Sequence, residues 1–155
     1  MRTFFSYSER GHIPRSLFWF ALLTILLLFD QIIKYLVFYS FESRTDTVSI
    51  GISQFKNFQF AFSLPVPQSL MYTLYAAVLF GILTYLRKTW VSLSFWNWFA
   101  WILILAGALS NIGERIALGY VRDFIHFFWG YFNFADVYIV VGVIILLFGL
   151  DRQRK

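Results

Sequence analysis

The sequence predicts an all-α membrane protein with four transmembrane helices and a small extracytoplasmic β-sheet in the first outer loop. The 155 residues are 59% hydrophobic and only 14% charged, whereas about a quarter of the residues in a soluble domain are charged. Four apolar runs are long enough, or nearly so, to cross a bilayer, which takes about 20 residues of helix. The length is that of one domain, and we expect residues 1–155 to form a single unit.

The four predicted spans cover roughly residues 16–38, 70–86, 93–112 and 134–150. A cleavable signal peptide is the alternative for the first run, but the run is too long for the apolar core of such a peptide. No small-x-small cleavage site follows it. We therefore expect all four runs to be spans.

Basic residues orient the predicted bundle. Four spans put both termini on one side of the membrane, and eight basic residues fall on that side against five on the other. The terminal side carries Arg2, Arg10, Arg15, Arg87, Lys88, Arg152, Arg154 and Lys155, and the other side carries Lys34, Arg44, Lys56, Arg115 and Arg122. We therefore expect cytoplasmic termini. Because the basic residues cluster beside apolar runs, the net charge of +5 indicates a membrane protein, and we expect no nucleic-acid partner.

The first outer loop, residues 39–69, contains two segments that alternate apolar and polar residues. Residues 47–52 and 55–62 each have this period of two, which predicts two short antiparallel strands with a turn near Ser53. Such a sheet could lie on lipid headgroups, hold an extended peptide by strand addition, or only pack on the bundle. The second outer region, residues 115–133, is short and aromatic, and we expect it to enter the membrane interface as a half-helix.

Two aspartates, Asp123 and Asp136, lie at the edges of apolar runs. Ionisable groups at membrane depth are costly and indicate a functional site. Two carboxylates brought together by neighbouring elements can share a proton and activate a water molecule. Structural alternatives stay open: Asp136 follows Asn133 by three residues, as in a helix cap, and Asp123 could pair with Arg122.

Four further polar residues occur in pairs at helical spacing. Asn111 and Arg115 are one turn apart and share a helix face. Arg115 could pair with a carboxylate across the site or only extend to the membrane interface. Asp30 and Lys34 have the spacing of an intrahelical ion pair, and the alternative is a hydrogen-bonding post that faces the site. We expect Glu114 at the surface or extended toward the interface.

The chain contains no cysteine and only two histidines, His12 and His126. A disulfide framework, a thiolate nucleophile and a zinc–sulfur site are therefore excluded. The two histidines are too few and too far apart in the sequence for a metal site built on imidazole. We expect chemistry that needs no metal and no organic cofactor.

An ordered set of polar motifs is more specific than any single residue. The set comprises Asp30-x-x-x-Lys34, Asn57-x-x-x-Ala61-Phe62-Ser63, Gly107-Ala108-Leu109-x-Asn111-x-x-Glu114-Arg115, Leu118-Gly119-Tyr120-Val121-x-Asp123-Phe124 and Phe132-Asn133-x-Ala135-Asp136. From about Asp30 to Gly142 the chain resembles the lipoprotein signal peptidases, the type II signal peptidases of bacteria.

This resemblance implies an intramembrane aspartyl endopeptidase of the bacterial inner membrane. It implies that the enzyme cuts the signal peptide from prolipoproteins just before a cysteine that carries diacylglycerol, near the outer face of the membrane. Its expected partners are these prolipoproteins and membrane lipid, and we expect a monomer. The resemblance assigns Asp123 and Asp136 as the catalytic pair. It assigns as supporting residues Asn111, Arg115, Asn133, Asn57, Asp30 and Lys34.

The chain departs from the family's pattern at several positions. Phe58-Gln59-Phe60 replaces a small Thr-Gly-Ala stretch, Ser110 replaces a glycine, Glu114 replaces an aspartate, and Arg122 replaces an apolar residue. These changes leave a second reading open, a catalytically inactive homologue that serves as a membrane binding or assembly module. A small transporter is disfavoured, because the second span is almost free of polar residues.

Overall fold

The computed structural model describes residues 15–40, 50–59, 67–89, 92–128 and 130–149. These residues form four helices and three strands. In chain order they are α1 (Arg15–Ser40), β1 (Ile50–Asn57), α2 (Gln68–Thr89), α3 (Phe95–Leu118), β2 (Val121–Phe127), β3 (Gly130–Phe132) and α4 (Phe134–Gly149).

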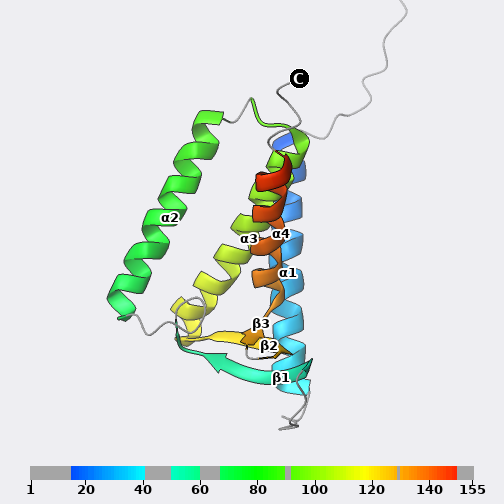
Figure 1. Ribbon diagram of the computed structural model, residues 1–155, viewed down its shortest axis with the longest axis vertical. Helices are drawn as coiled ribbons and strands as arrows, with labels where there is room; N and C mark the ends of the chain where they lie inside the picture. The colour runs from blue at the N-terminus through cyan, green and yellow to red at the C-terminus, as the bar shows by residue number, and fades with distance from the viewer. Residues whose placement is uncertain (1–14, 41–49, 60–66, 90–91, 129, 150–155) are drawn as a thin grey trace, which may run out of the picture.

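The helices run lengthwise, and the sheet closes one end of the molecule (Figure 1). α1, α3 and α4 form a packed group, while α2 stands apart from them along much of its length. The Arg15 end of α1 and the Gly149 end of α4 both lie at the end far from the sheet. The sheet end is therefore the place where α1 and α3 finish and α4 begins.

Three of the four predicted spans are confirmed as helices long and apolar enough to cross a membrane, namely α1, α2 and α3. α4 is a shorter apolar helix of 16 residues, so the fourth span stays a prediction. α3 continues to Leu118, beyond the predicted end at residue 112. Large apolar side chains on α1, α2 and α4 face outward, with Phe20, Phe80 and Phe148 exposed. Such faces suit contact with lipid.

The sheet differs from the predicted hairpin. Residues 50–57 form one strand, β1, and the expected turn near Ser53 is instead a bulge between Ile52 and Phe55. β1 pairs antiparallel with β2, which pairs antiparallel with β3. The alternating pattern correctly indicated extended structure at residues 50–52 and 55–57. It does not specify the partner strand, and the two predicted strands are one. Residues 47–49 and 60–62 of the predicted strands lie outside the described residues.

The half-helix expected within residues 115–133 is also wrong. That region forms the last turn of α3 and then β2 and β3. Phe128 has a φ of 51° in the turn between these two strands. Most of the described aromatic residues of the region therefore belong to a hairpin of β2 and β3, and β2 pairs with β1 along its other edge.

Close contact between α3 and α4 depends on two glycines. A side chain at Gly107 of α3 would clash with the carbonyl oxygen of Ala135, and one at Gly142 of α4 would lie 2.7 Å from the carbonyl oxygen of Ala100. Both alanines are fully buried. Small residues let membrane helices approach until their backbones are in contact. This contact fixes the start of α4 against α3.

We predict that Gly107→Ala lowers the thermal stability of the protein in detergent, because the new methyl group must push α4 away. Overpacking of this kind typically costs about 1–3 kcal/mol. Gly81→Ala in α2 is the matched control, since nothing lies within 4 Å of a side chain at that position. Alanine is the better helix former, so Gly81→Ala should keep or raise the melting temperature. Equal melting temperatures for both variants would contradict this account of the contact.

Candidate active site

Asp123 is placed by the short connection from α3 to β2. Gly119 ends α3 in the left-handed conformation, with a φ of 82°, and its N–H donates to the Arg115 carbonyl. A glycine adopts this conformation without strain. β2 begins two residues later at Val121. Asp123 then lies inside the molecule, with only 1% of its surface exposed.

The carboxylate of Asp123 accepts hydrogen bonds on both oxygens. Asn57 Nδ2, at the end of β1, donates to Oδ2 over 2.9 Å, and Asn133 Nδ2 donates to Oδ1 over 2.6 Å. Burial raises the pKa of Asp123 from its ordinary 3.8 to about 6, and the charge of Asp136 acts in the same direction. The hydrogen bonds from the two asparagines oppose this shift. Asp123 is therefore a carboxyl group that can hold a proton near neutral pH.

Asp136 lies in the first turn of α4 and forms a reciprocal cap with Asn133. The Asp136 N–H donates to Asn133 Oδ1 over 3.0 Å, and the Asn133 N–H donates to Asp136 Oδ2 over 3.0 Å. The predicted capping pair is confirmed. Asn111 Nδ2, from α3, donates to the other carboxylate oxygen over 2.8 Å. The position at a helix N-terminus favours the ionised form of this carboxylate.

Two asparagines connect the two carboxylates. Asn133 contacts Asp123 through its side chain and Asp136 through its backbone. Its Nδ2 also donates to Asn111 Oδ1 over 3.2 Å, and Asn111 contacts Asp136 directly. The structure thus brings together Asn57, Asn111, Asp123, Asn133 and Asp136, as the sequence predicted for site residues.

Arg115 lies beside this group but contacts other residues. Its Nη2 donates to the Gln59 carbonyl oxygen over 2.5 Å, and its guanidinium lies 5.6 Å from the centre of the Tyr75 ring. The Tyr72 hydroxyl donates to the Arg115 carbonyl over 3.1 Å. Among the described residues, Arg115 forms no ion pair with a carboxylate. It joins α2 and the segment after β1 to α3, with 6% of its surface exposed.

Asp30 and Lys34 form the predicted intrahelical ion pair, with Lys34 Nζ 2.8 Å from Asp30 Oδ2. Both are fully buried. Asp30 Oδ1 also accepts the Ala135 N–H over 3.0 Å, and Lys34 Nζ donates to Asn111 Oδ1 over 3.0 Å. The pair is therefore also a hydrogen-bonding post: it fixes the start of α4 and orients Asn111, which holds Asp136.

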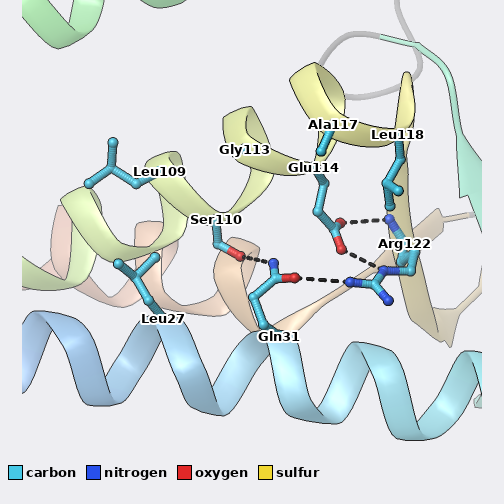
Figure 2. A pocket seen from close by; sticks show the side chains of 9 residues that line it. All are labelled: Leu27, Gln31, Leu109, Ser110, Gly113, Glu114, Ala117, Leu118 and Arg122. Carbon is cyan, nitrogen blue, oxygen red and sulfur yellow. Dashed lines mark hydrogen bonds and ion pairs between the residues drawn. The ribbon is translucent and has the colours of Figure 1, made fainter.

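The prediction that Glu114 lies at the surface is wrong. α3 extends past it, so Glu114 lies inside with 4% exposed. Its Oε1 lies 2.6 Å from Arg122 Nε (Figure 2). Its Oε2 lies 3.2 Å from Lys34 Nζ. Arg122 consequently pairs with Glu114 and not with Asp123, because adjacent residues of a strand point to opposite faces.

Two polar residues of this interior were missed as site residues. Gln31 accepts from Arg122 Nη2 over 2.9 Å and donates to Ser110 Oγ over 2.8 Å. Ser110 Oγ in turn donates to Asp30 Oδ2 over 2.5 Å. The available signal was that Gln31 interrupts an apolar run directly beside Asp30.

The chemistry open to this site is that of paired carboxylates. Within the described residues, no three histidine, aspartate or glutamate side chains are grouped as a metal site. Asp123 and Asp136 sit in each other's field, in different settings: one on a strand between two amide donors, the other at a helix N-terminus. Acid–base catalysis by two carboxyl groups commonly uses such a pair, in which the two groups lie in different surroundings.

The sequence and the fold of this chain both match known proteins. The model of the family described as Signal peptidase (SPase) II matches residues 22–150. The lipoprotein signal peptidase of Psychromonas ingrahamii is 35% identical over 142 residues, which cover 84% of this chain and 82% of the relative. The lipoprotein signal peptidase of Vibrio parahaemolyticus is 30% identical over 151 residues, covering 88% of each.

A solved structure of a bacterial membrane enzyme has the same fold, with a TM-score of 0.71 and 23% identity over 89% of this chain and 91% of that one. A second structure of a bacterial membrane enzyme gives a TM-score of 0.68, at 22% identity over 88% of this chain and 94% of that one. The resemblance read from the motifs is confirmed by the family match and by the two relatives. The chain belongs to the signal peptidase II family.

Proposed function

We propose that this membrane protease is an aspartyl endopeptidase that removes the signal peptide from diacylglyceryl-modified prolipoproteins, just before the lipidated cysteine. The observation that carries the proposal is the pair of inward-facing aspartates, Asp123 and Asp136, connected through Asn111 and Asn133. Relatives named lipoprotein signal peptidase support the substrate class. The peptide bond itself would be cleaved by water, activated by the two carboxylates.

The two carboxylates divide the work. Asp136, at a helix N-terminus, is the ionised partner and takes a proton from a water molecule. The water oxygen bonds to the scissile carbonyl carbon while Asp123 donates its proton to the carbonyl oxygen. When the C–N bond breaks, Asp136 passes its new proton to the leaving nitrogen. The proton on the oxygen returns to Asp123, which restores the starting state.

The asparagines hold these groups in register and supply no proton of their own. Asn57 and Asn133 direct their amide groups at Asp123, and Asn111 directs its amide at Asp136. Fixed donors of this kind favour one orientation of each carboxylate and need no rearrangement during the reaction. Arg115 lies beside this group and contacts the loop residue Gln59 and α2.

We further propose that α4 is a fourth span, with both termini in the cytoplasm and the sheet at the outer face. Sixteen helical residues extend about 24 Å, somewhat less than a hydrocarbon layer of about 30 Å. The shared placement of the α1 start and the α4 end supports this arrangement (Figure 1). Arg87 and Lys88 in the last turn of α2 also fall at the far end from the sheet.

We predict that Asp123→Asn and Asp136→Asn each abolish cleavage of a diacylated prolipoprotein in detergent. Each variant removes one member of an acid–base pair, and such a group contributes about 10²–10⁴-fold. Gel filtration and thermal unfolding should show that both variants remain folded. Wild-type rates in either folded variant would sink the assignment.

We predict that kcat/KM falls as pH rises above about 6, since Asp123 then loses the proton it must donate. The pH at which the rate falls follows from the raised pKa of Asp123, because an aspartate of ordinary pKa would lose that proton about two pH units lower. The measurement is a pH–rate profile between pH 4 and 9 at substrate concentrations below KM, with stability checked at each pH. A profile that rises through this range would contradict the role of Asp123 as proton donor.

We predict that a cysteine at Lys56 reacts with an impermeant thiol reagent on intact cells, whereas one at Ser92 does not. Both positions are exposed, and they lie at opposite ends of the molecule. The chain has no other cysteine to react. Labelling of Ser92→Cys alone would invert the proposed topology.

A further inference from the structure

We propose that Glu114 and Arg122 are positioning residues for Asp123. They fix the backbone of β2 beside Asp123 on the side that faces α1 and α3, which we call its rear side. With Gln31 they form what we call the rear clamp (Figure 2). The inference rests on the proposed function and deepens it, because it adds two residues that act through Asp123. Neither residue touches the carboxylate pair among the described contacts.

Glu114 grips Arg122 at two points. Its Oε1 lies 2.6 Å from the Arg122 Nε, and its Oε2 accepts the Arg122 backbone N–H over 2.9 Å. Arg122 Nη2 then donates to Gln31 Oε1 over 2.9 Å. Figure 2 shows the three side chains converging between α1 and α3. The backbone just before Asp123 is thus fixed to both helices.

The clamp replaces a missing strand. β3 pairs with β2 only from Ile125 to Phe127, so at Arg122 and Asp123 the sheet continues on the β1 side alone. On that side Asp123 pairs with Phe55, which is the first residue of β1 after the bulge. The Glu114 carboxylate supplies the acceptor that a strand would otherwise give to the Arg122 N–H. Without it, this stretch of β2 would be held on one edge only.

The four charges around the clamp balance when Glu114 and Arg122 are both present and become unbalanced when only one of them is removed. Asp30 and Glu114 oppose Lys34 and Arg122, and all four are buried. Removal of one member of a buried ion pair leaves an uncompensated charge, whereas removal of both does not. A double substitution should therefore be milder than the product of its parts.

The test compares Glu114→Ala, Glu114→Gln, Arg122→Leu and the double variant Glu114→Gln/Arg122→Leu with wild type. Each new side chain is no larger than the one it replaces, so it fits without overpacking, and a cavity of about 400 Å³ borders the clamp. The matched control is Lys56→Leu: Lys56 pairs with Arg122 in the sheet register but is exposed. Turnover of a diacylated prolipoprotein and hydrogen exchange of the β2 amides are measured on each.

We expect Glu114→Ala and Arg122→Leu to lower kcat about 10- to 100-fold with KM within about twofold, because a displacement of about 1 Å can cost this much. Glu114→Gln keeps an acceptor for the Arg122 N–H and should retain more activity than Glu114→Ala. The double variant should lose less than the product of its single variants. Exchange at residues 122–124 should rise in the clamp variants and stay unchanged in Lys56→Leu.

An unchanged kcat in the clamp variants, or faster exchange throughout the protein, would overturn the positioning role. So would equal losses in Glu114→Ala and Glu114→Gln. If wild type cleaves no prolipoprotein, the proposed function fails, and exchange at residues 122–124 still decides the clamp: a local rise supports it and no change refutes it.

Discussion

Lys34 carries its charge where no solvent reaches it, and the polar interior is arranged around that charge. Its ammonium group contacts Asp30, Glu114 and Asn111, so one side chain of α1 meets two side chains of α3. An isolated buried ammonium would be prohibitively costly. Each partner therefore offsets part of the free-energy cost of burying that charge.

Each of these partners also fixes another part of the site. Asp30 caps the start of α4 at Ala135, Asn111 donates to Asp136, and Glu114 holds the strand that carries Asp123. The two aspartates thus take their positions from one buried cation, although they belong to different elements. The glycine contact between α3 and α4 provides the close packing that this network requires.

The sequence predicted this site better than it predicted the surrounding chain path. Asp123, Asp136, Asn111, Asn133 and Asn57 were expected together, because the ordered motifs that carry them resemble those of the signal peptidase family. The partner of β1 could not be predicted, since period-two alternation marks a strand without naming its neighbour. Glu114 was misplaced for a related reason. A charged residue near the end of an apolar run looks exposed unless the helix is known to continue, and here the burial of Glu114 depends on Arg122 folding back from β2.

The position of Asp30 along α1 has a consequence for how water, the second reactant of the proposed hydrolysis, reaches the site. Asp30 lies fifteen residues beyond Arg15, or about 22 Å along the helix axis. Ten further residues of α1 separate it from the end of the helix at Ser40. In the proposed topology, in which α1 spans the membrane, the carboxylates that Asp30 helps to place therefore lie beside a part of the helix that lipid chains surround. For the proposed hydrolysis, water is then the scarce substrate, and its arrival at the carboxylates becomes a step that the protein must accommodate as carefully as the entry of the peptide.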